Sequence, residues 1–243
     1  MKKSIVMSCL LITSSALFAS GHEHWGYAGE QGPENWAQLS HDNFACTGAN
    51  QSPVNLTGFV EADLTPIQFN YKAGGSEIVN NGHTVQINYQ QGSSMTVDGH
   101  EFFLKQVHFH APSENHIDGQ SYPLEGHLVH ADAQGNLAVV AVMFTEKNTN
   151  AGFAQAWSQM PKNEGDTYQL KTVFNINDIL PENRDYYRFN GSLTTPPCSE
   201  GVRWFVLKDS VAVSAEQVKA FADVLTGPNN RPVQATNARV ILK

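Results

Sequence analysis

Short runs of alternating apolar and polar residues, separated by turn residues, dominate this chain of 243 residues. Alternation at every second position places one face of a β-strand against a core and the other toward solvent. The turn sequences Asn80-Asn81-Gly82 and Asp98-Gly99 stand between such runs and favour tight turns. Strands are therefore predicted over residues 67–71, 77–80, 84–89, 94–97, 101–110, 125–131 and 137–145.

Only two segments have clear helical periodicity. Residues 150–160 carry apolar residues at helical spacing before Pro161, which ends a helix. Residues 214–225 open with Ser214 and Gln217, the spacing of a capping box. Because no long helix separates the strands, the predicted fold class is mainly β. We expect a single domain with a large, mostly antiparallel, twisted central sheet and a few short peripheral helices.

Residues 1–20 are predicted to be a secretory signal peptide. A start with two lysines is followed by an apolar run, residues 5–18, and by small residues at Ala19 and Ser20 that offer a cleavage site. The apolar run is too short and wrongly flanked for a membrane span, although a retained anchor is the alternative. The mature protein, residues 21–243, is long enough for a single domain with a full apolar core. It is expected to be periplasmic or secreted and to have no membrane span.

The chain is acidic, with a formal charge of −8. No basic stripe is present that could neutralise phosphates, so nucleic acid is not expected as a partner. Removal of the signal peptide would leave two cysteines, Cys46 and Cys198. In an oxidising compartment, two cysteines favour a disulfide, and two buried unpaired cysteines are the alternative. Closing a loop of about 150 residues could stabilise the fold by roughly 4–5 kcal/mol in the chain-entropy description.

Three histidines are placed so that neighbouring strands could bring them together. His108 and His110 lie two apart in the predicted strand 101–110, so their side chains share a face. His127 lies in the predicted strand 125–131. Three imidazoles with one coordination position left are typical of catalytic zinc, whereas structural zinc usually has four protein ligands that include Cys. The polar mouth of a barrel is the alternative interpretation of these two strands.

Each of these strands also carries a side chain suited to orienting a metal ligand. Gln106 shares the face of His108 and His110, and Glu125 shares the face of His127. Either group could accept the imidazole N–H that faces away from a metal, which would fix the tautomer and the ring orientation.

Six strings of the sequence are distinctive when they are taken in order. They are HWGYAGEQGPENW (24–36), NQSPVNL (50–56), NNGHTVQI (80–87), QVHFHAPSEN (106–115), LEGHLVH (124–130) and GSLTTPPCSEGVRWFV (191–206). In this order they resemble the α-class carbonic anhydrases, and the matches run in family order from about residue 24 to 240, nearly the whole mature chain. The export signal and the two cysteines most resemble the bacterial periplasmic members.

The resemblance implies an enzyme that reversibly hydrates carbon dioxide to bicarbonate and a proton. His108, His110 and His127 would bind one Zn²⁺ per chain, with an attacking water or hydroxide as the fourth ligand. Asn229 lies where the family has a backbone carbonyl that accepts from His110, although Asn230 beside it replaces an aromatic residue common in animal members. The walls of the carbon dioxide site would be Val129, Val139, Leu193, Val202 and Trp204.

Glu114 and Thr194 match the pair that orients the nucleophile in this family. The Glu114 carboxylate would accept the Thr194 hydroxyl proton, so that the Thr194 oxygen accepts in turn from the attacking group. Thr195 would contact bicarbonate. Without the resemblance, Glu114 would be interpreted as a surface charge and the two threonines as part of a polar turn.

His83 matches the proton shuttle of the family, a role suited to a side chain that titrates near neutral pH. Tyr27, Asn81 and Gln86 match positions that order the connecting water molecules. Gln86 is longer than the Asn of many animal members, and Phe189 replaces a Tyr, so the details of this network are expected to differ.

Two other functions are consistent with the fold that the resemblance implies. One is a binding module that lost the chemistry, and the other is a periplasmic zinc-buffering protein. Retention of all three histidines together with Glu114 and Thr194 favours the enzyme. Carbon dioxide and bicarbonate are the expected small-molecule partners. Similar bacterial proteins include dimers, so a homodimer is considered, but no patch in the sequence identifies an interface.

Overall fold

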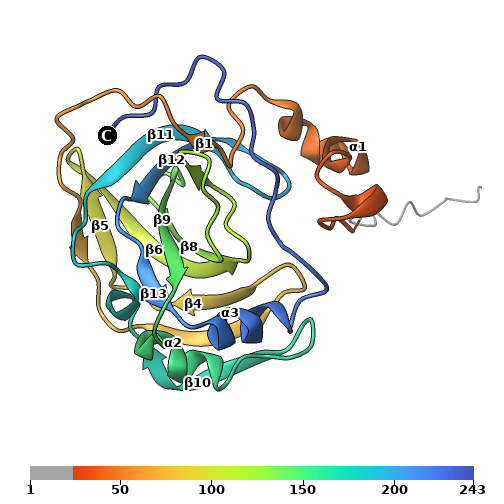
Figure 1. Ribbon diagram of the computed structural model, residues 1–243, viewed down its shortest axis with the longest axis vertical. Helices are drawn as coiled ribbons and strands as arrows, with labels where there is room; N and C mark the ends of the chain where they lie inside the picture. The colour runs from red at the N-terminus through yellow and green to blue at the C-terminus, as the bar shows by residue number, and fades with distance from the viewer. Residues whose placement is uncertain (1–23) are drawn as a thin grey trace, which may run out of the picture.

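The computed structural model describes residues 24–243, and the predicted signal peptide lies outside these residues (Figure 1). Within residues 24–243, no helix is long and apolar enough to cross a membrane. The helices are short: η1 (Gly29–Gln31), η2 (His41–Thr47) and η3 (Ile176–Ile179) are 3-10 helices, and α1 (Trp36–Leu39), α2 (Ala151–Trp157) and α3 (Ala215–Ala222) are α-helices.

Strands make up most of the regular structure. They are β1 (Asn55–Leu56), β2 (Gln68–Asn70), β3 (Gly75–Asn80), β4 (Val85–Tyr89), β5 (Ser94–Val97), β6 (His100–His110), β7 (His116–Ile117), β8 (Leu124–Ala131), β9 (Leu137–Glu146), β10 (Thr167–Phe174), β11 (Tyr186–Ser192), β12 (Glu200–Leu207) and β13 (Val211–Val213). Each of the seven predicted strands is present, with ends shifted by at most two residues.

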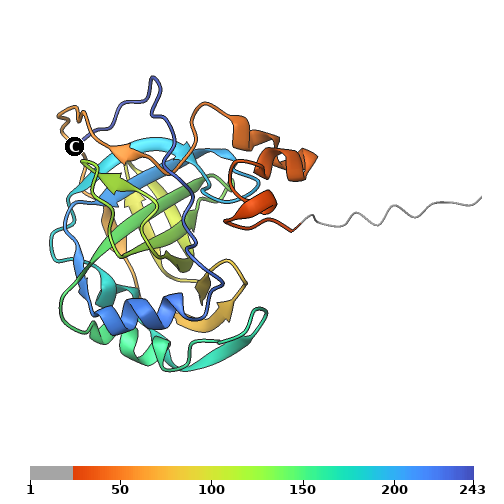
Figure 2. The same ribbon diagram turned by 45° about the vertical axis from the view of Figure 1, so that its right-hand side comes forward.

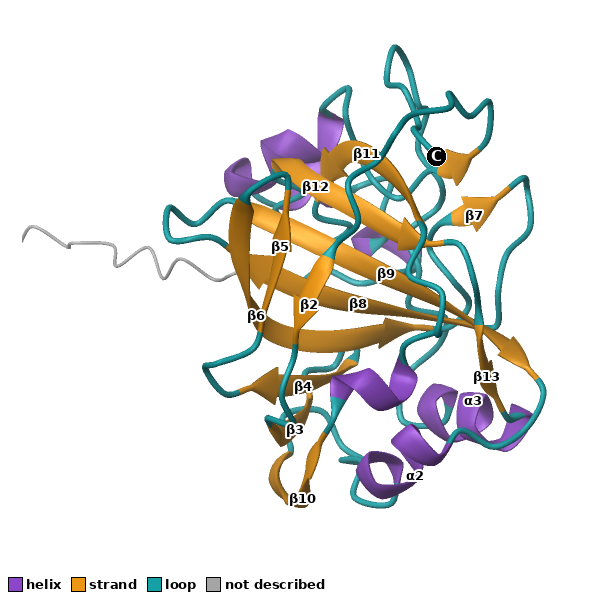
Figure 3. Cartoon of the chain, turned by 90° about the vertical axis from the view of Figure 1, so that its left-hand side faces the viewer, coloured by secondary structure: helices purple, strands orange, loops and turns teal. Residues whose placement is uncertain are grey.

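Eleven strands form one large sheet, which crosses the molecule obliquely in Figure 3. Its main path runs β10-β3-β4-β6-β8-β9-β12-β11, while β5 joins β6, β2 joins β5 and β13 joins β9. The pairs are antiparallel except for β12 and β13 on β9. The small β1–β7 sheet is parallel. The predicted fold class, mainly β with a mostly antiparallel sheet, is therefore confirmed.

Several strands were not predicted because they do not alternate cleanly. In β10, at one end of the sheet path, only Leu170 and Phe174 are buried, so exposed residues hide the period of two. In β12, Val202 and all four residues of 204–207 are buried. A strand covered on both faces is a continuous apolar run rather than an alternating one.

The two predicted helices are present but shorter than expected. Helix α2 begins after Asn150, whose side chain accepts the N–H of Gly152. Helix α3 begins after Ser214, which forms the predicted capping box with Gln217. Figure 1 places α2 and α3 beside β10 at the lower end of the molecule, and Figure 2 shows the N-terminal helices well apart from them.

The large sheet separates two apolar clusters. On β9, Val140 belongs to the larger cluster and its neighbour Val139 belongs to the smaller one. On β8, Leu128 belongs to the larger cluster, so the alternation of side chains turns His127 toward the face that carries the smaller cluster. Helices α2 and α3 contribute Phe153 and Phe221 to the larger cluster. The predicted site therefore lies on the face that these helices leave free.

Cys46 and Cys198 form the predicted disulfide, with an S–S distance of 2.05 Å and a Cα–Cα distance of 4.9 Å. The bond joins η2 to the loop between β11 and β12. This loop also carries Thr194 and Thr195. The disulfide therefore tethers a loop with two predicted site residues to the N-terminal part of the domain.

Candidate metal centre

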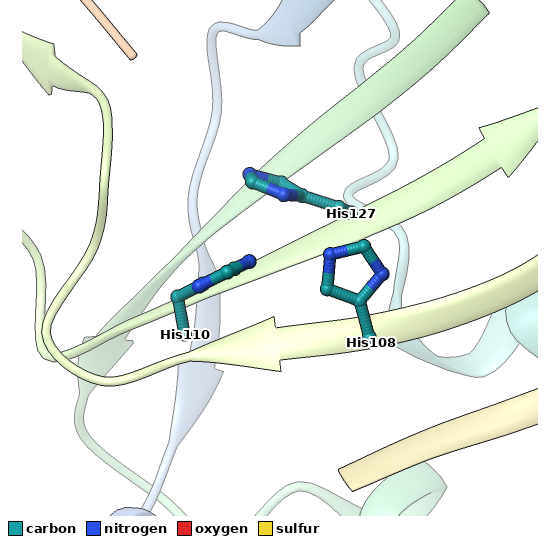
Figure 4. A group of neighbouring side chains, drawn as sticks. All are labelled: His108, His110 and His127. Carbon is teal, nitrogen blue, oxygen red and sulfur yellow. The ribbon is translucent and has the colours of Figure 1, made fainter. Parts of the chain in front are cut away.

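The register between β6 and β8 brings the three predicted histidines together. His108 lies directly opposite His127 in this antiparallel pair, and His110 lies two residues farther along β6. Figure 4 shows the three imidazoles turned toward one another, two from one strand and one from its neighbour. One nitrogen of each ring lies within 4.8 Å of the others, and residues 24–243 contain no second group of three potential metal ligands.

The outer nitrogen of each imidazole faces a hydrogen-bond acceptor. The three pairs are His108 Nδ1 with Gln106 Oε1 at 2.9 Å, His110 Nδ1 with the Asn229 carbonyl oxygen at 2.7 Å, and His127 Nε2 with Glu125 Oε1 at 2.9 Å. Carbonyl and carboxylate oxygens only accept, so these ring nitrogens carry the proton. The lone pairs therefore point inward from Nε2 of His108 and His110 and from Nδ1 of His127.

Burial lowers the pKa of all three histidines. For His108, the neighbouring His110 and His127 lower the pKa further. For His110, the Asn229 carbonyl and Glu125 raise the pKa, but burial prevails. The three imidazoles are therefore neutral at neutral pH, which is the form that binds a metal ion.

Glu125 is the main structural support of the site. Its carboxylate is buried and accepts the backbone N–H groups of Glu114 and Asn115 at 2.7 and 2.8 Å. It also accepts the Asn115 side-chain amide at 2.7 Å and faces His127. Because His127 and Glu114 depend on the same carboxylate, Glu125 fixes their positions relative to each other.

Glu114 is fully buried beside the inward-facing nitrogens. Its Oε2 lies 3.5 Å from His110 Nε2 and 3.9 Å from His127 Nδ1. Its Oε1 accepts the Arg231 backbone N–H at 2.8 Å. Burial raises the pKa of Glu114, whereas the Arg231 N–H and the Thr194 side chain lower it.

Thr194 is buried near Glu114, in the loop held by the disulfide. Although the Thr194 hydroxyl lowers the pKa of Glu114, Glu114 Oε2 has no partner in good hydrogen-bond geometry among residues 24–243. The bond between them therefore stays a prediction. Thr195 is half-buried, and its carbonyl oxygen accepts the Cys198 N–H at 2.8 Å.

Arg231 is a buried residue of the site that sequence reasoning missed. Its guanidinium donates to Gln51 Oε1 and to the Ser52 carbonyl oxygen, each at 2.8 Å. These bonds anchor the C-terminal segment whose backbone N–H contacts Glu114. No local pattern in the sequence signals this role, because its partners lie about 180 residues away.

The five residues predicted to form the apolar wall all belong to the smaller apolar cluster. Three are buried and two are partly buried: Val139, Val202 and Trp204, and Val129 and Leu193. The Trp204 ring packs edge-on against His127, with ring centroids 4.9 Å apart. Phe189 stacks parallel to Trp204 at 6.0 Å. The cluster therefore reaches a predicted metal ligand.

His83 lies in the turn between β3 and β4 and is half-buried. Its ring stacks on Trp25, with centroids 3.7 Å apart and an interplanar angle of 9°. The His24 ring lies 5.7 Å away. Burial lowers the pKa of His83, His24 lowers it further, and Glu164 raises it. Trp25, His24 and Glu164 were not among the predicted site residues, although the first two lie in one of the family-like strings.

Of the other predicted residues of the proton path, Tyr27 lies near His83 and Gln86 lies nearer to the metal centre. The Tyr27 ring lies 6.5 Å from the His83 ring, and its hydroxyl has no partner in the described part of the chain. Gln86 lies opposite His108 in the β4–β6 register and donates to Asn88 Oδ1 at 2.6 Å.

Asn81 has a structural contact that was not predicted. Its side-chain oxygen accepts the backbone N–H groups of His83 and Thr84 at 3.0 and 2.9 Å. This oxygen therefore holds the turn that carries His83.

Of the histidines without a predicted role, His130 is buried and its Nε2 lies 2.7 Å from the Tyr71 hydroxyl.

The donor set fits a zinc ion. Zinc accepts imidazole nitrogen as a ligand and commonly binds three protein ligands at catalytic sites. His110 Nε2 and Glu114 Oε2 are buried polar atoms that have no hydrogen-bond partner within residues 24–243. A cation held by the three histidines would satisfy the first atom and attract the second.

Comparison with known proteins identifies the family. A profile described as eukaryotic-type carbonic anhydrase matches residues 31–243. The chain belongs to the α-carbonic anhydrase family. As a carbonic anhydrase, it is an enzyme of the class whose general reaction is the hydration of carbon dioxide.

Individual relatives of this α-carbonic anhydrase match nine-tenths or more of the chain. The carbonic anhydrase of Pectobacterium atrosepticum is 46% identical over 243 residues, which is all of both chains. The α-carbonic anhydrase of Thermovibrio ammonificans, solved with the inhibitor sulfanilamide, is 46% identical with a TM-score of 0.90, covering 92% of this chain and 100% of that one. Dioscorin, solved with ascorbate, is 29% identical with a TM-score of 0.83. The match covers 90% of this chain and 97% of the dioscorin chain.

Proposed function

We propose that this carbonic anhydrase depends on zinc and uses a histidine proton shuttle to interconvert carbon dioxide and water with bicarbonate and a proton. The observation that carries the proposal is the set of three inward-facing nitrogens on His108, His110 and His127, each fixed by an acceptor behind it. When bound, zinc would supply a Lewis acid that makes water nucleophilic at neutral pH, a property for which carbonic anhydrases are themselves the standard example.

We assign orientation of the nucleophile to Glu114 and Thr194. A dication nearby favours the ionised form of Glu114, which can only accept hydrogen bonds. Donation by the Thr194 hydroxyl to Glu114 Oε2 would leave the Thr194 oxygen free to accept from a nucleophile that carries a proton. The pair would then aim the nucleophile and disfavour anions that have no proton to donate. Thr195, next in the loop, would contact bicarbonate.

The smaller apolar cluster suits the substrate. Carbon dioxide is apolar and offers little to a hydrogen-bond donor, so a site for it is expected to be apolar. The wall residues named above share one cluster, and Trp204 touches His127. We infer that this wall holds carbon dioxide beside the histidines.

The decisive experiment is stopped-flow carbon dioxide hydration with purified wild-type protein, a chelated sample and His108→Ala. We expect one zinc ion per chain, loss of hydration on chelation, recovery when zinc is restored, and no activity in the variant. The reason is that His108 would supply one of the three protein ligands that residues 24–243 offer at this site. Stoichiometric zinc without hydration would contradict the proposed enzyme.

We assign proton transfer to solvent to His83, with Tyr27, Asn81 and Gln86 along the path. Replacing His83 with alanine should lower kcat at low buffer concentration by about one to two orders of magnitude, since the variant lacks a group that titrates near neutral pH. Imidazole buffer should restore much of the loss, and kcat/KM should change little. A variant with wild-type kcat in weak buffer would exclude His83 as the shuttle.

Dioscorin is the reason to keep a binding function as the second candidate. Its structure contains ascorbate on a similar fold, so this fold is compatible with a ligand other than carbon dioxide. A zinc-buffering protein is a weaker candidate, because residues 24–243 hold only one group of three potential ligands. Ascorbate titration of the zinc-loaded protein would detect the binding function, and the hydration assay above separates both alternatives from the enzyme.

We also propose that the protein is exported to the periplasm or secreted, with residues 1–20 removed. The Cys46–Cys198 disulfide supports this because such bonds persist in oxidising compartments. Cell fractionation and N-terminal sequencing of the mature protein test it, and an intact N-terminus on a cytoplasmic protein would contradict it. The homodimer stays a prediction of the resemblance.

A further inference from the structure

An acidic side chain that the proposed mechanism does not use lies near His83. Glu164 belongs to the segment between α2 and β10. Its Oε1 lies 4.0 Å from Nε2 of His24, and both side chains are about two-thirds exposed. His24 in turn lies beside His83, with ring centroids 5.7 Å apart. Two imidazoles and one carboxylate therefore form a small group at the surface.

Backbone contacts place Glu164 against the turn that carries His83. Gly165 donates its N–H to the Asn80 carbonyl oxygen at 2.8 Å, which joins this segment to the end of β3. Gly82, which precedes His83, has a φ of +84°, and a Cβ at this position would lie 2.7 Å from Glu164 Oε1. The carboxylate therefore packs on the backbone of the turn, in space that only glycine leaves free.

The ring of His83 has few other charged neighbours. Trp25 covers one face of the ring, and the Tyr27 phenol lies at its edge. Burial and the charge of His24 both disfavour the protonated form and lower the pKa of His83, and Glu164 is the group that raises it. Burial and His24 thus oppose protonation of His83, and the Glu164 carboxylate favours it.

We propose that Glu164 is a positioning residue for proton release, which stabilises the protonated form of His83 and offsets the charge of His24. The inference rests on the proposed shuttle function of His83. Glu164 itself gains and loses no atom. The proton moves from the water at the site to a His83 ring nitrogen, and then from that nitrogen to buffer or solvent.

The direct test is an NMR pH titration of the His83 ring in the mature zinc-loaded protein at low ionic strength. In Glu164→Gln, the His83 midpoint should fall by about 0.3 to 0.7 pH units, a range expected for a single surface charge. His24→Gln should move the midpoint in the opposite direction. The matched control is Glu182→Gln, which removes an exposed carboxylate elsewhere on the surface and should leave the midpoint unchanged. Added salt should shrink the Glu164 effect.

The second readout is kinetic. Because transfer toward a less basic imidazole is less favourable, kcat of Glu164→Gln in weak buffer should fall about twofold to fivefold, with kcat/KM unchanged. An unshifted His83 midpoint, or a shifted midpoint with unchanged kcat, would overturn the role of Glu164. His83→Ala measured in parallel separates the two proposals. Normal turnover in that variant would refute the shuttle itself, whereas slow turnover there with normal turnover in Glu164→Gln would refute only the inference about Glu164.

Discussion

Replacing Thr194 with valine should lower kcat/KM for carbon dioxide hydration by about two orders of magnitude, while the protein keeps one zinc ion per chain. Valine preserves the shape of the side chain and removes the hydroxyl. Oriented polar groups that act in the transition state contribute factors of about 10² to 10³. Thr194 forms no hydrogen bond to the outer nitrogens of the three histidines, so metal affinity should not depend on it. Stopped-flow hydration and zinc analysis on the same sample provide the measurement.

A double-mutant cycle with Glu114→Gln examines whether the two residues act as one unit. If Glu114 works only by fixing the Thr194 hydroxyl, the double variant should be about as slow as either single variant, because coupled groups are not additive. Thr195→Val is the matched control and should lose far less activity. Unchanged kcat/KM in Thr194→Val, or additive losses in the cycle, would contradict the relay.

The largest effect on stability is expected for Glu125→Ala. This change would leave four buried donors without their acceptor: the backbone N–H groups of Glu114 and Asn115, the Asn115 amide and the His127 ring N–H. Each buried donor left unsatisfied costs about 1–3 kcal/mol, so we expect a loss of about 4 kcal/mol or more in the free energy of unfolding. Denaturant unfolding of the zinc-free protein measures this loss apart from metal binding.

Zinc affinity should fall in the same variant, by about 10- to 100-fold, because the acceptor behind His127 is lost. Glu125→Gln keeps the side-chain volume and one acceptor oxygen, so its stability and zinc affinity should lie between those of the wild-type protein and Glu125→Ala. Glu146→Ala is the matched surface control, since Glu146 is an exposed carboxylate at the end of β9. This variant should have nearly the same free energy of unfolding as the wild-type protein. A small loss for Glu125→Ala in the zinc-free protein would show that the donors find other partners.

Local patterns in the sequence were sufficient for the strands that alternate. Residues 94–97 match β5, and the capping box at Ser214 marks the start of α3. The same rules missed β10 and β12, whose burial depends on their place in the sheet. An edge strand and a strand covered on both faces differ from a half-buried strand only through neighbours that are distant in sequence.

For the candidate site too, local patterns predicted some of the features and missed others. The period of two placed His108 and His110 on one face, and the structure brings them to His127. The hydrogen bond behind His110 could not be derived from a local pattern, since Asn229 lies 119 residues away. Arg231 was missed for the same reason.

The sequence by itself determined the ligand types, the faces that they share and the family, because spacing and side-chain chemistry are local properties of the chain. Only the tertiary structure decided which nitrogen of each histidine faces inward, since that choice depends on acceptors supplied by Gln106, Glu125 and Asn229. It also decided that Glu164 lies against the turn of His83. These contacts join segments through strand register and loop packing, and no periodicity along one segment encodes them.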